Sequence, residues 1–261
     1  MGYLLITGGE EIGRSVELIE DFDPLLFREP PVQNKSILLL AVAATSLISM
    51  SASAAVIASW SMATAVPSAT TGTSYDYGSA DSGDLASGTM LSSVHAVAAT
   101  TYSTPSGNGS TYSLSSNNWS VGDYYQVSVS TIGYSGVSIS WDQTRSGTGP
   151  ASFELVSSTD GGASWSTLIA SYSVVQAGGS GTQTTSWNTN TNQPGVFTTT
   201  SAAAGASDSA SVLFRIRSLV VATSTGGSNR IDNVIVSGSM VPAPGAIALL
   251  GLAGLIGRRR R

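Results

Sequence analysis

The side chains that could do chemistry in this sequence are few and scattered. Hydrolysis of a glycosidic bond needs two carboxylates about 5 to 10 Å apart, and segment 55–240 contains one glutamate, Glu154. Asp142 could approach it across a sheet, although both lie in patterns that suit a solvated face. A Ser–His–Asp arrangement around His95, the only histidine, would need partners from distant positions. We therefore expect no catalysis, and the protein is predicted not to be an enzyme.

Aromatic side chains offer a different chemistry, because sugar rings stack their apolar C–H faces on them. Trp119 and Trp187 lie in the polar stretches SSNNWS and TTSWNTNTN. These two residues are predicted to be exposed and to be the candidates for glycan contact. Trp141 and Trp165 are expected to be buried.

Charge and cysteine content exclude several classes of function. The chain of 261 residues has no cysteine, which rules out disulfides, thiolate metal sites and cysteine nucleophiles. Segment 55–240 has no lysine and only four arginines against nine acids. Nucleic acid is excluded as a partner because phosphates demand clustered basic side chains. No cofactor is expected.

Alternation of apolar and polar residues marks several strands between the two ends of the chain. Val137, Ile139 and Trp141 are predicted to face one side of a sheet. The stretch after a first strand near 56–62, up to about Thr111, has little periodicity and is expected to be irregular. The other predicted strands are Tyr124–Ser130, Val137–Trp141, Ser152–Ser158, Ser166–Tyr172 and Val212–Ser218.

Strands separated by Gly, Ser and Asn turns predict an all-β fold. The expected architecture is an antiparallel two-sheet sandwich, with jelly-roll topology as the expected connection. An N-terminal signal helix and a short C-terminal hydrophobic helix complete the expected fold. The exported β-sandwich domain is predicted to span residues 55–240.

The stretch STDGGASW, Ser158 to Trp165, resembles the Asp-box of sialidases and other propeller proteins. A propeller repeats this box once per blade, and here it occurs once. We interpret it as a hairpin turn in which Asp160 accepts backbone N–H groups and Gly161 or Gly162 supplies positive φ.

The stretch from Phe214 to Gly238, with GGSNRIDNVIVSG at its end, resembles the closing strands of secreted jelly-roll and carbohydrate-binding modules. In such modules an acidic residue of this strand supports a structural Ca²⁺, which makes Asp232 a weak calcium candidate. The favoured alternative is that Asp232 and Asn233 form hydrogen bonds with local loops.

The N-terminal region contains the pattern of a secretory signal peptide. Residues 35–54 place Lys35 before an apolar run that ends in small residues. Seven acids in residues 1–34 do not fit this pattern, and that segment is interpreted as a spurious or disordered extension. A buried helix is the alternative for the apolar run. In the signal-peptide interpretation, Ala52 and Ala54 supply the small side chains before the cleavage site, and the mature chain begins at Ala55.

The C-terminal residues 241–261 combine Val-Pro-Ala-Pro, an apolar run and four arginines. As a helix the run would span about 20 Å, which is short for a hydrocarbon core of about 30 Å. This order resembles the PEP-CTERM sorting signal, with Ala243 where that family has Glu. The resemblance implies recognition and removal by an exosortase; a plain membrane anchor is the alternative. The residues assigned to the signal are Val241, Pro242, Pro244, Arg258, Arg259, Arg260 and Arg261.

Both ends predict the same topology, with the domain outside and the terminal arginines inside. The sequence therefore predicts an exported, exosortase-sorted protein of the cell surface or extracellular matrix, with a non-catalytic β-sandwich. The alternative is a carbohydrate-binding module for exopolysaccharide. Its expected partners are signal peptidase, the exosortase, the inner membrane transiently, and exopolysaccharide.

Overall fold

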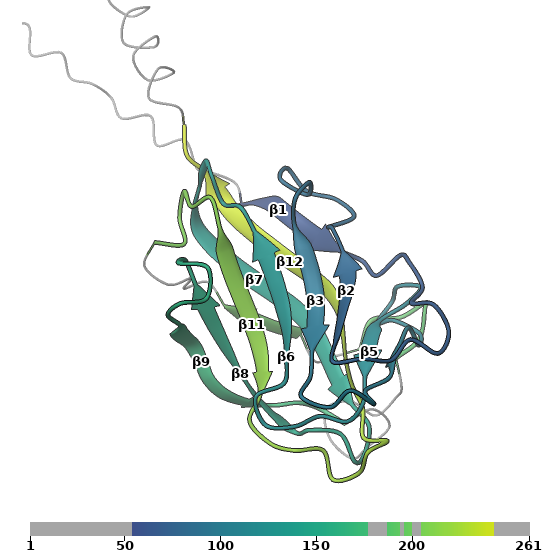
Figure 1. Ribbon diagram of the computed structural model, residues 1–261. Helices are drawn as coiled ribbons and strands as arrows, with labels where there is room; N and C mark the ends of the chain where they lie inside the picture. Colours follow the sequence, from purple (N-terminus) through teal and green to yellow (C-terminus); the bar gives the residue numbers. More distant parts are fainter. Residues whose placement is uncertain (1–53, 177–186, 194–195, 200–204, 243–261) are drawn as a thin grey trace, which may run out of the picture. The chain divides into compact units, whose positions relative to one another are not determined.

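The computed structural model describes residues 54–176, 187–193, 196–199 and 205–242. The regular secondary structure of these residues consists of twelve β-strands, and no helix lies among them. Figure 1 shows how the strands are arranged. No helix among the described residues has the length and apolar character needed to cross a membrane. The expected signal helix and C-terminal hydrophobic helix lie outside the described residues.

The first sheet, called here the β6–β11 sheet, has the strand order β2-β3-β6-β11-β8-β9. Every neighbouring pair in it is antiparallel. Its strands are β2 (Ser74–Gly78), β3 (Met90–Val94), β6 (Tyr124–Val129), β8 (Ser152–Ser158), β9 (Ser166–Ser173) and β11 (Val212–Ser218).

The second sheet, called here the β7–β12 sheet, has the order β10-β7-β12-β5-β4, and β1 also pairs with β12. Its neighbouring strands are likewise antiparallel. Its strands are β1 (Ala54–Trp60), β4 (Tyr102–Ser103), β5 (Leu114–Ser116), β7 (Tyr134–Arg145), β10 (Val196–Thr199) and β12 (Asn229–Met240).

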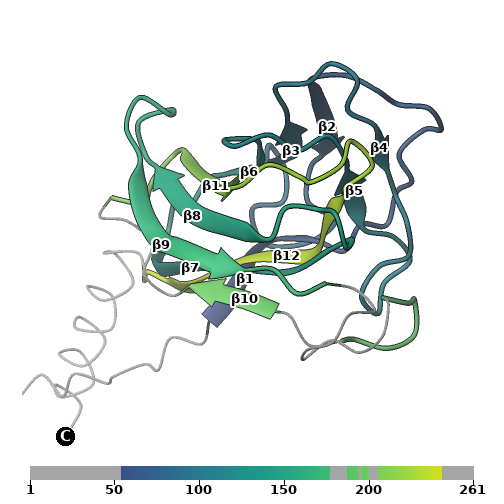
Figure 2. The same ribbon diagram turned by 90° about the horizontal axis from the view of Figure 1, so that it is seen from below.

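The two sheets form the layers of a sandwich, which Figure 2 shows nearly edge-on. Only β2–β3, β4–β5 and β8–β9 join consecutive strands within a sheet; β6, β7 and β8 alternate between sheets. Strands far apart in sequence are therefore neighbours, such as β6 with β11 and β7 with β12. The prediction of an all-β, antiparallel, two-sheet fold is confirmed.

The core lies between the two sheets and follows the alternation in the sequence. On β7 the side chains of Val137, Ile139 and Trp141 are fully buried. On β11 the same holds for Val212, Phe214 and Ile216, which face them from the other sheet. Burying each such side chain stabilises the fold by about 1.5 to 3 kcal/mol. The predicted inward faces of these strands are confirmed.

A bulge in β12 changes which side chains face outward. Asp232 pairs with Asp142, but the next paired residue is Ile235 with Ser140, so β12 contains one extra residue. Asn233 takes a φ of 48° at this point. As a result Asp232 faces outward while Val234 returns to the core.

The expectation that the chain is irregular up to about Thr111 is wrong, because β2, β3 and β4 lie there. Strand β3 is the sequence MLSSV, and its Ser92 and Ser93 are buried. Buried hydroxyls give no apolar alternation, so hydrophobic periodicity does not detect this strand.

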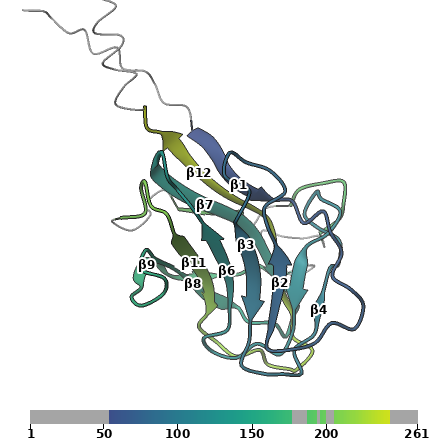
Figure 3. The same cartoon turned by 45° about the horizontal axis from the view of Figure 1, so that its top comes forward.

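The ends of the sandwich lie side by side. Strand β1 begins at Ala54, which pairs with Ser239 near the end of β12 (Figure 3). The chain therefore enters and leaves the sandwich at neighbouring points of one strand pair.

Candidate functional site

The outer face of the β6–β11 sheet carries an arginine between two aromatic rings. The Cζ atom of Arg215 lies 4.0 Å from the ring centroid of Tyr124 and 4.1 Å from that of Trp165. Arg215 pairs in register with Gln126, and Tyr124 is its diagonal neighbour on β6. The Arg215 Nε atom donates a 2.7 Å hydrogen bond to Gln126 Oε1. Strand register thus assembles the cluster.

An ion pair continues this row of polar side chains. Arg217 pairs in register with Glu154 of β8, and its Nε lies 2.7 Å from Glu154 Oε1. Burial lowers the pKa of Arg215, although an arginine stays charged at any working pH. We call the set the arginine–aromatic face; it consists of Tyr124, Gln126, Glu154, Trp165, Arg215 and Arg217.

All six side chains of this face are partly exposed. Aromatic rings offer apolar surface to the C–H face of a sugar, while guanidinium, amide and carboxylate groups match its hydroxyls. Arg215 also holds the two rings in fixed positions, which lowers the ordering cost of binding. The arrangement can therefore bind a sugar ring without any reacting group.

Trp165 reaches this face because of the turn before β9. The Asp160 carboxylate accepts hydrogen bonds from the Ser164 backbone N–H and hydroxyl, and these bonds lower the pKa of Asp160. Gly161 and Gly162 have φ values of 73° and 95°. The hairpin-turn interpretation is confirmed. The expected burial of Trp165 is wrong, because its indole lies over Arg215 on the outer face.

Trp119 and Trp187, predicted to be exposed for glycan contact, are instead 1% and 4% exposed. Trp119 packs edge-on against His95 and Tyr125 in the core, and its Nε1 donates to the Ser116 carbonyl. Polar neighbours in sequence suggest exposure, but both rings are buried. Neither indole is placed to stack on a ligand.

Trp187 instead packs on a cation. Its ring lies 5.0 Å from the Cζ atom of Arg230, a β12 residue on the outer face of the β7–β12 sheet. The indole packs on an arginine and is only 4% exposed, so it has almost no surface left for a sugar ring.

The two carboxylates considered for glycoside hydrolysis are kept apart by the fold. Glu154 belongs to β8 of the β6–β11 sheet, and Asp142 to β7 of the β7–β12 sheet. Both alternate with core residues, so they occupy opposite outer faces of the sandwich. They do not form a catalytic pair.

The fold does bring two serines and an aspartate within hydrogen-bond distance of His95. Its Nδ1 lies 3.1 Å from Asp123 Oδ2, and its Nε2 lies 3.0 Å from both Ser93 Oγ and Ser116 Oγ. All four residues are buried. Asp123 also accepts the backbone N–H groups of Ala96 and Ser120. The cluster joins strands and loops inside the core, where even Ser116, which borders the cleft described below, is only 1% exposed.

Asp232 binds a loop, which is the alternative favoured over calcium. Its Oδ2 accepts the Asn108 backbone N–H at 2.6 Å and the Ser110 hydroxyl, and its Oδ1 accepts the Asn233 N–H. The facing Asp142 accepts the side-chain amides of Asn108 and Asn233. These bonds fasten the β4–β5 loop over β7 and β12.

Burial raises the pKa of Asp232 to about 6, against the effect of its three donors, and the nearby Asp142 charge raises it further. Burial likewise raises the pKa of Asp142. Within the described residues no group of three or more His, Cys, Asp or Glu side chains could hold a metal ion. The carboxylate oxygens of Asp232 face N–H and O–H donors, so the residues present do not fit a cation.

Some predicted residues of the two ends fall within the described part of the chain. Ala54 and Ala55 are the first residues of β1. Val241 is exposed, and its N–H bonds the Gly133 carbonyl at 2.7 Å; Pro242 follows it. Ala52, Pro244 and Arg258 to Arg261 lie outside the described residues.

No protein-family model and no curated protein matches this sequence. The solved structures to which this chain is similar include two carbohydrate-binding proteins. One is the N-terminal tandem of CBM22 domains from Paenibacillus barcinonensis, at 15% identity and a TM-score of 0.34 over 68% of this chain. The chain spans 48% of the length of that structure. The other is a family 11 carbohydrate-binding module from Clostridium thermocellum, in complex with a mixed-linked β-1,3-1,4 tetrasaccharide.

The second likeness has 10% identity and a TM-score of 0.31, over 71% of this chain and 99% of that one. Both structures are carbohydrate-binding modules by their descriptions. Likeness at this level assigns no ligand to the present chain, so the function is argued below from its own residues.

Proposed function

We propose that this chain is an exported, non-catalytic protein whose β-sandwich, 55–240, binds extracellular polysaccharide through the arginine–aromatic face. The observation that carries the proposal is the position of Arg215 between the Tyr124 and Trp165 rings, on an exposed sheet surface. Gln126 and the Arg217–Glu154 pair lie beside it and supply hydrogen-bonding groups for sugar hydroxyls.

The fate of the two ends is part of the same proposal. Residues 35–54 act as a signal peptide after the extension 1–34, and 241–261 act as a PEP-CTERM-like sorting tail removed by an exosortase. The protein is then displayed at the cell surface or released into the matrix. In support, the order of proline motif, apolar run and arginines is that of the sorting signal. We also propose that the strands of the sandwich are connected in jelly-roll topology.

Polysaccharide binding is tested with the full chain by affinity electrophoresis in gels that contain xylan, mixed-linkage β-glucan or another neutral polysaccharide. Tyr124→Ala and Trp165→Ala are expected to weaken binding about tenfold or more. Each variant loses the apolar area and the stacking of one ring, and about 1.4 kcal/mol corresponds to a tenfold change in affinity. Ile132→Ala is the matched control, because Ile132 is a large side chain 56% exposed and outside the face.

Retarded migration that the two aromatic variants abolish and the control keeps supports the proposal. Absence of retardation by every polysaccharide, or equal retardation of all variants, contradicts it and leaves a purely structural surface role. Sorting is tested separately by replacing Arg258 to Arg261 with serine and following C-terminal processing by mass spectrometry. Unchanged processing in that variant would contradict the sorting tail.

A further inference from the structure

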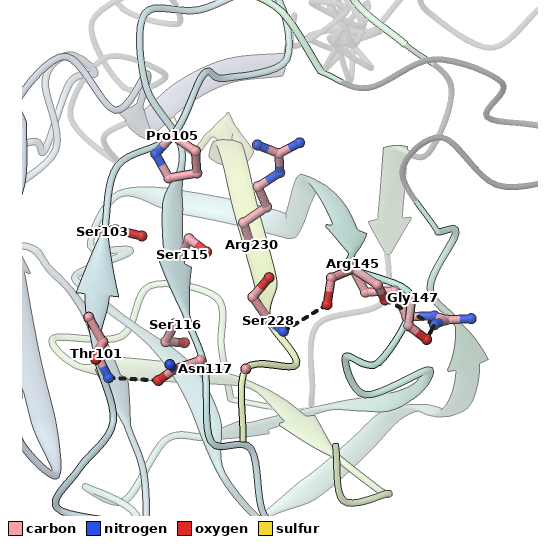
Figure 4. A pocket seen from close by; sticks show the side chains of 12 residues that line it. Thr101, Ser103, Pro105, Ser115, Ser116, Asn117, Arg145, Gly147, Ser228 and Arg230 are labelled. Atoms are coloured by element: carbon pink, nitrogen blue, oxygen red, sulfur yellow. Dashed lines mark hydrogen bonds between the residues drawn. The ribbon is translucent and has the colours of Figure 1, made fainter. Parts of the chain in front are cut away.

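A cleft of about 560 Å³ lies on the opposite side of the sandwich from the arginine–aromatic face (Figure 4). Its floor is the outer surface of β4, β5 and the start of β12. In register, Ser103 pairs with Ser115, and Ser115 pairs with Arg230. These three side chains therefore form one row across three strands. The volume is within the range of small-ligand sites, about 300 to 1,000 Å³.

The cleft collects positive charge in a domain that is otherwise acidic. Of the four arginines among the described residues, Arg145 and Arg230 line the cleft. None of its described lining residues is an aspartate or glutamate. Asp232, two positions from Arg230 on the same strand, is covered by the donors of Asn108, Ser110 and Asn233. Only the guanidinium groups therefore present charge to the cleft.

Arg230 is held rigidly with part of its guanidinium uncommitted. The ring of Trp187 lies 5.0 Å from its Cζ atom, and Nη1 donates a 3.2 Å hydrogen bond to the Ser106 carbonyl. Within the described residues this is the only hydrogen bond of that guanidinium. Burial lowers the pKa of Arg230, yet an arginine remains charged. A planar, fixed guanidinium with free N–H groups is suited to a carboxylate or another anionic oxygen group.

Arg145 has a supporting role at the rim of the cleft. Its Nε donates to the Val174 carbonyl, and its Nη1 donates to the Ser146 and Gly147 carbonyls. These bonds fix the position of its charge, as Figure 4 shows for the Gly147 contact. The second arginine thus adds positive potential, while Arg230 is the group placed to form direct hydrogen bonds.

The remaining lining is polar and carries hydroxyl groups. Ser103 is exposed, and the Ser115 hydroxyl makes only a long 3.4 Å contact with the Asn229 carbonyl. No aromatic ring is among the described lining residues. A cleft of this kind suits a ligand that combines an anionic group with hydroxyl groups, and it does not suit an apolar one.

We propose that this cleft binds the anionic group of an acidic saccharide, with Arg230 as the direct partner and Ser103 and Ser115 as hydroxyl partners. This site is separate from the arginine–aromatic face, and each can fail without the other. A uronate carboxylate and a sugar phosphate share the chemistry required, and the probes below distinguish them.

The test is isothermal titration of the full chain with three probes: trigalacturonate, its neutral methyl ester, and inorganic phosphate. Trigalacturonate is expected to bind, and the ester about tenfold or more weakly, because it lacks the charge that Arg230 recognises. Phosphate that competes with trigalacturonate identifies a general anionic-oxygen site, and phosphate that does not compete identifies a uronate site. Both outcomes support the cleft.

Variants of exposed Ser103 avoid the risk of unfolding. Ser103→Asp places a negative charge in the same row as Arg230, on the other side of Ser115, and is expected to weaken trigalacturonate binding about tenfold or more. Ser103→Asn is the matched control, because asparagine has nearly the size of aspartate and no charge. Its affinity for trigalacturonate is expected to stay within about twofold of that of the unmodified chain. Arg230→Gln is expected to act like Ser103→Asp, while Ile132→Ala, at an exposed residue outside both sites, is expected to leave trigalacturonate binding unchanged.

Equal affinity for trigalacturonate and its ester would overturn the proposal. So would unchanged binding in Ser103→Asp, or binding in Arg230→Gln that equals that of the Ile132→Ala control. Loss of neutral-polysaccharide binding by Tyr124→Ala with intact trigalacturonate binding would separate this site from the arginine–aromatic face.

Discussion

The Nδ1 atom of His95 lies 3.1 Å from Oδ2 of Asp123, and both residues are buried in the core. The other ring nitrogen, Nε2, is hydrogen-bonded to Ser116, so Asp123, His95 and Ser116 are linked as in a catalytic triad. Catalysis also needs a site where a reacting atom can reach the nucleophile, and Ser116 is 1% exposed. Burial therefore makes this cluster a stabilising hydrogen-bond network.

Asp123→Ala is expected to destabilise the protein strongly. The substitution leaves the His95 ring and the N–H groups of Ala96 and Ser120 without their acceptor. A buried unpaired donor costs about 1 to 3 kcal/mol. The bond to His95 is buried and the two backbone bonds are partly buried, so a loss of about 2 kcal/mol or more is expected in urea unfolding. Asp76→Ala, at an exposed position of β2, is the control and should change little. A loss below 1 kcal/mol would contradict the network role.

Trp119→Ala is expected to act on folding and not on a ligand site. The indole is fully buried against His95, Tyr125 and Phe153. Truncation of a buried tryptophan costs about 3 to 5 kcal/mol. Trp165→Ala, the partly exposed comparison, is expected to cost about 1 kcal/mol. Similar unfolding free energies for the two variants would show that Trp119 is not a core residue in solution.

The titration of Asp232 is expected to lower the free energy of unfolding as the pH rises from about 4 to about 6. Its pKa in the folded chain is about 6, above the ordinary value of 3.8. In this window the folded state holds more protons than the unfolded state, so the free energy of unfolding falls as pH rises. The full effect is at most about 3 kcal/mol. Asp232→Asn removes the titration, so its stability relative to the unmodified chain should rise from pH 4 to pH 7.

Asp76→Asn, on an exposed acid, is the control for that measurement and should run parallel to the unmodified chain. Calcium tests the alternative for Asp232. Because Oδ1 and Oδ2 already accept N–H and O–H donors, added Ca²⁺ is expected to leave the melting temperature unchanged at pH 7. A large calcium-dependent rise that Asp232→Asn abolishes would contradict the loop-fastening role.

The sequence was informative where one face of a strand is apolar. Ser152–Ser158 and Val212–Ser218 were predicted at their exact bounds, because Phe153, Leu155, Phe214 and their neighbours alternate with polar residues. Strand β3 is not detected because Leu91 is its only fully buried apolar residue, and the two residues after it, Ser92 and Ser93, are both serines. Local pattern thus identifies strands whose burial depends on hydrophobic side chains, and it misses those held by buried hydroxyls.

The candidate site could not be assembled from the sequence, because it depends on register between distant strands. Arg215 and Tyr124 are polar-face residues of two predicted strands, but their proximity needs β11 to lie beside β6. Exposure was misjudged for the same reason. Trp119 and Trp187 lie in polar stretches of sequence and are nevertheless buried, and Trp165 emerges from a turn beside the sheet face.

Arg215→Lys distinguishes the stacked geometry of the arginine–aromatic face from its charge. A planar guanidinium packs against the Tyr124 and Trp165 rings at once, and a lysine ammonium keeps the charge without that plane. Each cation–π contact at a partly exposed site contributes about 0.5 to 1 kcal/mol. The variant is therefore expected to lose about 1 kcal/mol of stability, to shift Trp165 fluorescence and to weaken neutral-polysaccharide binding. Arg217→Lys, whose role is the ion pair with Glu154, is the matched control. Equal binding by both variants would mean that charge alone, and not the fixed position of the two rings, determines recognition at this face.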